Sequence, residues 1–438
     1  MAKSNRFKIC YIGGGSRFVV TLLHGLAAQA EAIKALGRPI EVALYDVDTR
    51  RAGDMARYAE IVARQTGLPL TTTVTDDRDQ ALRDANWVLF SAGIWQPVVD
   101  ARERYLKPLG DVHGESGPAV IVESAALWPY LRNLAQDMKR LAPKAIFSTL
   151  VNPTDVMAAA FQQAFGIPAI GICVEVGGLK GWLAYNLEVD DRQINLEHVG
   201  VNHIGWVSRW TVNGQDGPAM LAAKICDRMQ RDDWYPHCNE FVWTFQATGH
   251  IRSSPYHHWP IQGVWDDERQ RRNDLWNRTC RPEGKGEYRQ MMLGKALAEG
   301  TMIPEVDPAR VHPEATPYTY PNTRWMLGAL AVGLAGGSAG PVPLQVRNGQ
   351  SNRYLPAQAW IEVPTMIEKG KVKPQAVPPL PEWLFNQTRT IALQRVEFVN
   401  WLAGQDPKGL SNGLLAMPNL APLGKLLQLA NDLPELVK

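Results

Sequence analysis

A glycine-rich turn near the start of the chain limits the folds that the chain can adopt. Gly13, Gly14 and Gly15 follow the apolar run Phe7–Ile12 and precede an amphipathic stretch that begins at Phe18. A strand, a glycine turn and a helix in this order are typical of the first unit of a Rossmann-type domain. The glycines let the backbone approach a pyrophosphate, and the helix N-terminus supplies free amide groups.

Apolar runs alternate with longer amphipathic stretches through the first half of the chain. This is the pattern of βαβ units on a parallel sheet. The predicted strands are Phe7–Ile12, Glu41–Tyr45, Leu70–Val74, Trp87–Ser91, Ala145–Leu150 and Ile167–Cys173, and the predicted helices are Phe18–Ala35, Arg50–Thr66 and Leu127–Leu141. We therefore expect an α/β fold whose N-terminal domain, residues 1–195, is a doubly wound parallel sheet that binds a dinucleotide.

The pattern changes after about residue 193. Ile194–Val201 and Trp206–Val212 are predicted strands of a mixed sheet, and a region rich in Trp, Arg and His follows to about residue 300. Helical periodicity returns in Trp325–Gly336 and from Leu384 onward, and Pro374–Pro381 is a predicted loop. We expect residues 196–438 to form an α+β domain for substrate, metal and subunit contacts.

Composition excludes several classes of partner. The chain has 438 residues, 46 basic against 44 acidic side chains and a net charge of +2, so neither nucleic acid nor an anionic membrane is an expected partner. The short polar segment before Phe7 does not have the layout of a secretory signal, and five dispersed cysteines do not suggest a disulfide framework. We expect a cytoplasmic protein that acts on a small molecule.

Polar side chains follow several predicted strands at the carboxyl edge of the sheet, where ligands bind in this fold. Asp46 ends the second strand, where a carboxylate binds the adenosine ribose and disfavours a 2′-phosphate, so NAD is favoured over NADP. Ser91 ends the fourth strand, and Asn152 follows the fifth, where nicotinamide and substrate meet. The predicted NAD site consists of Gly13, Gly14, Gly15, Ser16, Arg17, Phe18, Asp46, Ser91 and Asn152. The alternative is a structural turn, an N-capping Asp46 and an Asn-Pro that only ends a strand.

Cys173 and His203 lie at loop positions beside the same edge. One thiolate and one imidazole suit a soft or borderline divalent metal with open positions for substrate oxygens. Taken alone, either residue would more often be structural.

At these positions the chain resembles glycoside hydrolase family 4, the NAD- and divalent-metal-dependent glycosidases. The shared segments are Gly13-Gly14-Gly15-Ser16, Gly114-Glu115-Ser116-Gly117-Pro118, Asn152-Pro153, Cys173, Gly200-Val201-Asn202-His203, Asn348-Gly349 and Ile361-Glu362-Val363-Pro364. The resemblance implies a lactate/malate-dehydrogenase-like fold and manganese bound by Cys173 and His203. We also expect a homodimer or homotetramer.

The resemblance further implies a redox-assisted elimination. NAD takes a hydride from sugar C3, a base removes the C2 proton, the glycosidic oxygen leaves, water adds and NADH returns the hydride. Tyr256 is the candidate base, and a cation such as Arg252 or the metal would have to aid it near neutral pH. The expected substrate contacts are Asn152, Glu115, Asn202 and Arg271.

Two positions depart from the family pattern. Val174 follows Cys173 where the family usually has His, Asp or Asn, so either Glu175 or Glu115 assists the leaving group or the leaving group needs little help. After the fourth strand, phosphosugar members carry an Arg, whereas this chain reads Ser91-Ala92-Gly93-Ile94-Trp95. An unphosphorylated sugar or a uronide is therefore the expected carbohydrate substrate.

Two other functions fit the same residues. An NAD-dependent 2-hydroxy acid or sugar dehydrogenase shares the fold and the Asn-Pro after the fifth strand. A catalytically inactive protein that binds NAD and sugar is the third reading, and Val174 favours it.

Overall fold

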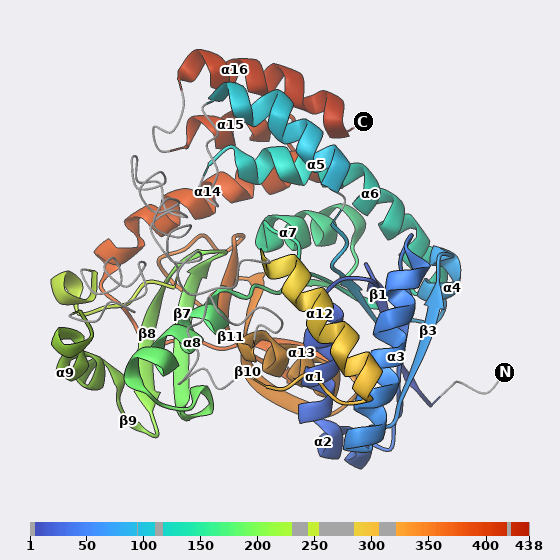
Figure 1. The fold of residues 1–438 in the computed structure, drawn as a ribbon. Coiled ribbons are helices and arrows are strands. Elements are labelled where there is room, and N and C mark those ends of the chain that lie inside the picture. Colours follow the sequence, from blue (N-terminus) through green and yellow to red (C-terminus); the bar gives the residue numbers. More distant parts are fainter. Residues whose placement is uncertain are drawn as a thin grey trace.

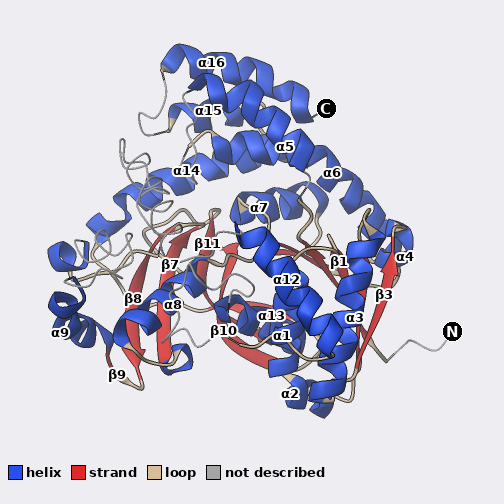
Figure 2. Cartoon of the chain, viewed as in Figure 1, coloured by secondary structure: helices blue, strands red, loops and turns tan. Residues whose placement is uncertain are grey.

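A single twisted sheet runs through the molecule, with helices on both faces (Figures 1 and 2). The computed structural model describes residues 5–93, 95–109, 117–229, 244–253, 284–305, 321–417 and 422–437. Along the first strand, Ile9 and Tyr11 enter one hydrophobic core while Cys10 and Ile12 enter another. Because alternate residues of a strand point to opposite faces, the sheet is buried on both sides.

The parallel half of the sheet has the strand order β3-β2-β1-β4-β5-β6, the order of a Rossmann-type domain. Its strands are β1 (Phe7–Ile12), β2 (Ile40–Tyr45), β3 (Leu70–Thr75), β4 (Trp87–Phe90), β5 (Ile146–Thr149) and β6 (Ala169–Gly171). All six strands lie where the sequence predicted them, and the neighbouring pairs are parallel. The predicted α/β fold class is confirmed.

The helices of this half connect the strands. They are α1 (Phe18–Ala28), α2 (Ala30–Ala35), α3 (Thr49–Thr66), α4 (Arg78–Leu82), α5 (Trp95–Ala101), α6 (Ala119–Leu141), α7 (Thr154–Phe165) and α8 (Glu175–Leu187). The predicted helix Phe18–Ala35 is divided at Gln29, whose φ of −108° and ψ of 15° leave the helical region. The helix predicted from Leu127 begins earlier and contains Pro129.

The sheet continues past β6 in the order β10-β11-β7-β8-β9. These strands are β7 (Ile194–Val201), β8 (Ile204–Val212), β9 (Gln215–Asp216), β10 (Ser338–Arg347) and β11 (Trp360–Glu368), and β12 (Lys371–Pro374) pairs with β11. The sequence predicted β7 and β8 but not β10 or β11. Prolines at 341, 343 and 364 argue against a strand, since they cannot donate to the ladder. Here Pro341 lies at a bulge, and Pro343 faces Pro364 across the strand pair.

Helices from the second half pack against elements of the first. Helix α13 (Pro321–Leu334) crosses α1 so closely that a Cβ at Gly25 would lie 2.3 Å from the Arg324 carbonyl oxygen. Phe398 of α14 (Phe385–Leu402) lies in the same core as residues of α6 and α7. The remaining helices are α9 (Gly217–Met229), α12 (Gly284–Glu299), α15 (Gly409–Leu415) and α16 (Leu423–Asp432). A division at residue 195 stays a prediction, because both the sheet and the packing continue across it.

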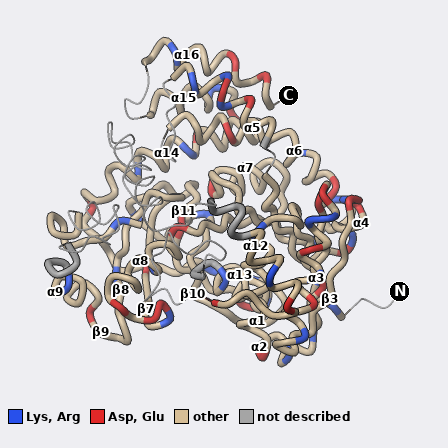
Figure 3. The backbone as a smooth tube through the Cα atoms, viewed as in Figure 1, with Lys and Arg blue, Asp and Glu red and all other residues tan. Residues whose placement is uncertain are grey.

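Acidic and basic positions are interspersed along the chain (Figure 3). This distribution agrees with the net charge of +2. Within the described ranges, each helix is too short or too polar to cross a membrane.

Candidate active site

The glycine turn between β1 and α1 is fixed to the neighbouring strands. The amides of Gly13 and Gly14 both donate to the Tyr45 carbonyl oxygen at the end of β2, at 2.9 and 2.8 Å. Gly13 has a φ of +96°, and a Cβ there would lie 2.8 Å from the Ala92 nitrogen. Only glycine fits this position, which is the requirement for a turn that lets a phosphate approach the backbone.

The other predicted NAD residues surround this turn. Asp46 Oδ2 accepts a 2.7 Å hydrogen bond from the Gly15 amide, and Ser16 Oγ lies 3.2 Å from Ser91 Oγ. The Arg17 guanidinium lies over the ring of Phe18, 5.4 Å from its centroid. A glycine turn, a helix N-terminus and a carboxylate at the end of β2 therefore meet at one edge. Amide donors for a pyrophosphate and a carboxylate acceptor for a ribose together fit a dinucleotide.

Cys173 and His203 come together at the same edge of the sheet. Cys173 lies just after β6, and His203 lies at the tip of the β7–β8 hairpin with a φ of +62°. The Cys173 Sγ is 3.2 Å from His203 Nε2, and Asn152 Nδ2 is also 3.2 Å from that nitrogen. Both side chains of the pair are buried. The structure thus joins three predicted site residues from three separate connections.

The Glu175 carboxylate lies beside the His203 ring, on the nitrogen that does not face Cys173. Its Oε2 lies 3.3 Å from His203 Nδ1, close enough for the carboxylate to favour a proton on Nδ1, which would leave the Nε2 lone pair for a metal. The Glu175 amide, in the first turn of α8, donates to Cys173 Sγ at 3.4 Å. The helix N-terminus favours negative charge on that sulfur.

A divalent metal fits between the sulfur and the nitrogen. For zinc, the bonds are about 2.3 Å to sulfur and about 2.0 Å to nitrogen. Their sum exceeds the 3.2 Å between the two atoms, so one ion can contact both. Among the described residues, no group of three or more His, Cys, Asp or Glu side chains could hold a metal ion. The two donors would thus leave coordination positions open for other ligands.

Asp155 fixes the backbone of the hairpin tip. Its Oδ2 accepts from the Asn202 amide at 3.3 Å and forms a buried ion pair with Arg395 of α14. The Asn202 side chain is fully buried, and neither its oxygen nor its nitrogen has a hydrogen-bond partner in the described part of the chain. A buried side-chain amide whose hydrogen-bonding atoms are unsatisfied is suited to contact a ligand.

A second buried chain of polar groups starts at the neighbouring Thr154. Thr154 Oγ1 donates to Gln345 Oε1, and Gln345 Nε2 donates to Glu362 Oε2 at 3.2 Å. Burial raises the pKa of Glu362 to about 8, so the carboxyl is neutral at neutral pH.

Several predicted site residues cannot be placed. Tyr256, Glu115 and Arg271 lie outside the described residues. Arg252, the cation considered for Tyr256, is buried and forms a β-bridge with Trp206. Sequence reasoning missed the positioning roles of Asp155 and Arg395, and it considered Glu175 only as an acid.

The fold and the site together define a Rossmann-type protein with a glycine turn and a Cys–His pair at the carboxyl edge of its sheet. The chain belongs to glycosyl hydrolase family 4. The description "Family 4 glycosyl hydrolase" matches residues 8–189, and "Family 4 glycosyl hydrolase C-terminal domain" matches residues 198–397. The resemblance found in the sequence is confirmed.

Individual proteins share part of the sequence or the overall fold with this chain. An α-galactosidase of Bacillus subtilis is 28% identical over 217 residues, 48% of this chain and 49% of that protein. The match therefore spans about half the length of this relative. A 6-phospho-β-glucosidase from Thermotoga maritima, solved with manganese, NAD⁺ and glucose-6-phosphate, has a TM-score of 0.69 at 17% identity and covers 98% of this chain and 97% of its own.

The similarity extends to a second class of fold relatives. A lactate dehydrogenase from a deep-sea metagenome library has a TM-score of 0.51 at 13% identity, over 90% of this chain and 99% of that chain. At this identity the comparison concerns the fold alone. It confirms the predicted lactate-dehydrogenase-like architecture.

Proposed function

We propose that this chain is a glycosidase that uses NAD and a divalent metal, manganese, to cleave a glycosidic bond. The reaction consists of oxidation at sugar C3, deprotonation at C2, elimination, hydration and re-reduction. The observation that carries the proposal is the contact of Cys173 with His203, with Asn152 on the same nitrogen, at the edge that holds the glycine turn. The 6-phospho-β-glucosidase of T. maritima, which has a similar fold, was solved with both cofactors, and this supports the proposal.

The residues of the site divide into those that would hold the cofactors and those that would contact the sugar. Bound NAD supplies reversible oxidation at C3, and the bound metal supplies Lewis acidity toward the sugar oxygens. Cys173 Sγ and His203 Nε2 hold the metal, while the glycine turn and Asp46 hold the dinucleotide. Asn152 and Asn202 orient the sugar between them, and Asp155 keeps the Asn202 backbone in place. Tyr256 is the proposed base at C2, with Arg271 and Glu115 as further substrate contacts.

Val174 cannot donate a proton to the leaving group, so another residue would have to act as the acid. Glu175 Oε2 is directed at His203 Nδ1, so we assign Glu175 to orienting that ring. Assistance to the leaving group then falls to Glu115, or the aglycone leaves without a proton.

The proposed substrate is an unphosphorylated sugar or a uronide. Ser91 contacts Ser16, and the backbone of Ala92 lies directly against Gly13, so small residues occupy the start of the connection after β4. The similarity to the α-galactosidase of B. subtilis supports this choice. We also propose that the protein is a cytoplasmic homodimer or homotetramer.

Turnover in heavy water tests the mechanism. Aryl glycosides and uronides would be screened with NAD and manganese under reducing conditions, and the released sugar analysed by NMR. Proton removal at C2 places deuterium at that carbon, whereas displacement at C1 leaves it untouched. An active preparation without C2 deuterium contradicts the elimination. Net accumulation of NADH would instead identify a dehydrogenase.

A further inference from the structure

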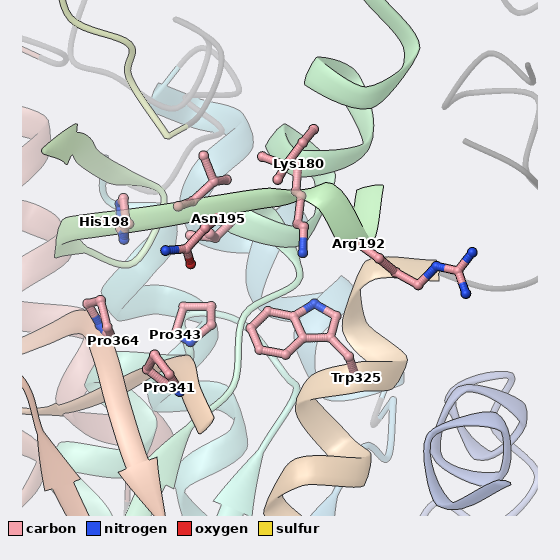
Figure 4. A pocket seen from close by; sticks show the side chains of 11 residues that line it. Lys180, Arg192, Asn195, His198, Trp325, Pro341, Pro343 and Pro364 are labelled. Carbon is pink, nitrogen blue, oxygen red and sulfur yellow. The ribbon is translucent and has the colours of Figure 1, made fainter. Parts of the chain in front are cut away.

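A cavity of about 210 Å³ lies away from the Cys173–His203 pair. Strands β7 and β11 pair only at Gly200 and Glu362, and the space opens where they separate. Helix α8, the first half of β7, the start of α13 and the strands β10 and β11 form its walls (Figure 4). None of the residues that line it belongs to the proposed NAD and metal site.

The side chains around this cavity present hydrogen-bond donors. Lys180 and Asn195 extend from α8 and β7 toward Trp325, while Arg192 points away (Figure 4). The Lys180 Nζ lies 5.3 Å from the Trp325 ring. The indole Nε1 of Trp325 is buried and has no acceptor in the described part of the chain. A buried donor without an acceptor is costly, and a ligand oxygen would remove this cost.

The charges at the cavity favour an anion. Among the described residues, Lys180 and Arg192 line it and no carboxylate does. Arg192 is already held by Asp190, with its Nε 2.9 Å from Oδ1. Burial lowers the pKa of Lys180, although Asp191 and Asp190 partly oppose this. Burial also lowers the pKa of His198 to about 3, so that ring is neutral. Since Arg192 is paired with Asp190, Lys180 is the basic side chain that remains for a ligand.

The opposite wall of the cavity is apolar. Pro341, Pro343 and Pro364 face Lys180 and Asn195 from below in Figure 4. Val176, Ile194 and Leu196 complete the lining. Such a wall suits the carbon skeleton of a ligand, in addition to a charged group.

We propose that this cavity binds a small organic anion. Its carboxylate or phosphate group would accept hydrogen bonds from Lys180 Nζ, Trp325 Nε1 and Asn195 Nδ2, and its carbon skeleton would pack on the three prolines. This inference does not depend on the proposed glycosidase activity.

Calorimetric titration of the full chain tests the site. The protein is saturated with NAD and kept free of metal, and the probes are gluconate, glucose 6-phosphate and uncharged glucose. We expect at least one anion to bind and glucose to bind at least about tenfold more weakly, because a hydrogen bond to a charged group contributes about 1.5–3 kcal/mol. Comparison of the two anions shows whether a carboxylate or a phosphate is preferred. Absence of binding by both anions, or equal binding of glucose, overturns the proposal.

Variants assign the binding to this cavity. Lys180→Met should weaken the anion about tenfold or more, Lys180→Arg should retain most of the affinity, and Trp325→Phe should weaken it by roughly threefold to tenfold. Lys224→Met, on α9 and outside the cavity, is the matched control and should bind like the unchanged protein. Affinity that survives in folded Lys180→Met and Trp325→Phe proteins would mean that the anion binds elsewhere. Melting temperatures show whether each variant is folded.

Discussion

Glu175 Oε2 lies 3.3 Å from Nδ1 of His203, on the side of the ring opposite to Cys173. The carboxylate is thus placed to fix the tautomer in which Nε2 binds a metal. Glu175→Gln should lower manganese affinity by about 10–100-fold, the usual cost of removing such an outer partner. Direct metal titration measures this without requiring activity. Glu188→Gln, at the other end of α8, is the control, and equal affinities in the two variants would remove Glu175 from this role.

The Cys173–His203 pair predicts a separation of metal binding from dinucleotide binding. Cys173→Ser and His203→Ala should each abolish manganese binding, because each removes one of the two protein donors. NAD affinity should stay largely unchanged, since neither residue lies in the glycine turn. Metal titration and NAD titration of the same preparations test both statements. Full metal affinity in either variant would place the metal elsewhere.

Asp46 contacts the glycine turn directly through Oδ2 and the Gly15 amide. Asp46→Ala should weaken NAD by about 1–3 kcal/mol, because charge-assisted hydrogen bonds are lost. Asp48→Ala removes the neighbouring carboxylate, which caps α3 by accepting from the Arg51 amide. This control should cost about 1 kcal/mol of stability without a change in NAD affinity. Fluorescence titration with NAD compares the two variants.

The buried pair of Asp155 and Arg395 predicts a large stability effect. Asp155→Ala should lower the free energy of unfolding by about 3–5 kcal/mol, because it leaves a buried guanidinium without its carboxylate. Asp54→Ala breaks an ion pair with Arg57 whose arginine is largely exposed, and should cost about 1 kcal/mol or less. Urea unfolding provides both values. Similar losses in the two variants would contradict the burial argument.

Glu362 predicts a dependence of stability on pH. Its pKa is raised from 4.5 to about 8, so folding favours the protonated form. The stabilisation from this group is complete below pH 4.5 and is lost as the pH rises to about 8. Glu362→Gln, which is neutral throughout, should lose less stability over this range than the unchanged protein. Urea unfolding at both ends of the range measures the difference, and parallel curves would argue against a neutral Glu362.

The parallel strands could be predicted from the sequence because each is a short apolar run bounded by turn residues. The strands β10 and β11 could not, since the prolines within them have the local signature of a loop. The strand pair accommodates these prolines through the bulge between Ala339 and Val342 and through the position of Pro343 opposite Pro364. Both features depend on the pairing of β10 with β11.

The candidate site divides in the same way. Cys173 and His203 could be predicted as metal ligands because a thiolate and an imidazole commonly bind divalent metals. The expected order of the strands places both residues at one edge of the sheet. The contact of Glu175 with His203 depends on a left-handed backbone at the hairpin tip, which no local pattern marks. Arg395 reaches Asp155 across 240 positions of sequence, so periodicity carries no information about that pair.

In the sheet, β10 and β11 lie between β6 and β7, and this order bears on when the candidate site can form during synthesis. Gly171 of β6 pairs with Gln345, and Gly200 of β7 pairs with Glu362, so the two strands that precede Cys173 and His203 are linked only through later parts of the chain. Residues 173 and 203 precede β10 and β11 in the chain, so both side chains leave the ribosome before these two strands do. Metal capture is therefore a late event, and an unfinished chain would lack the assembled pair.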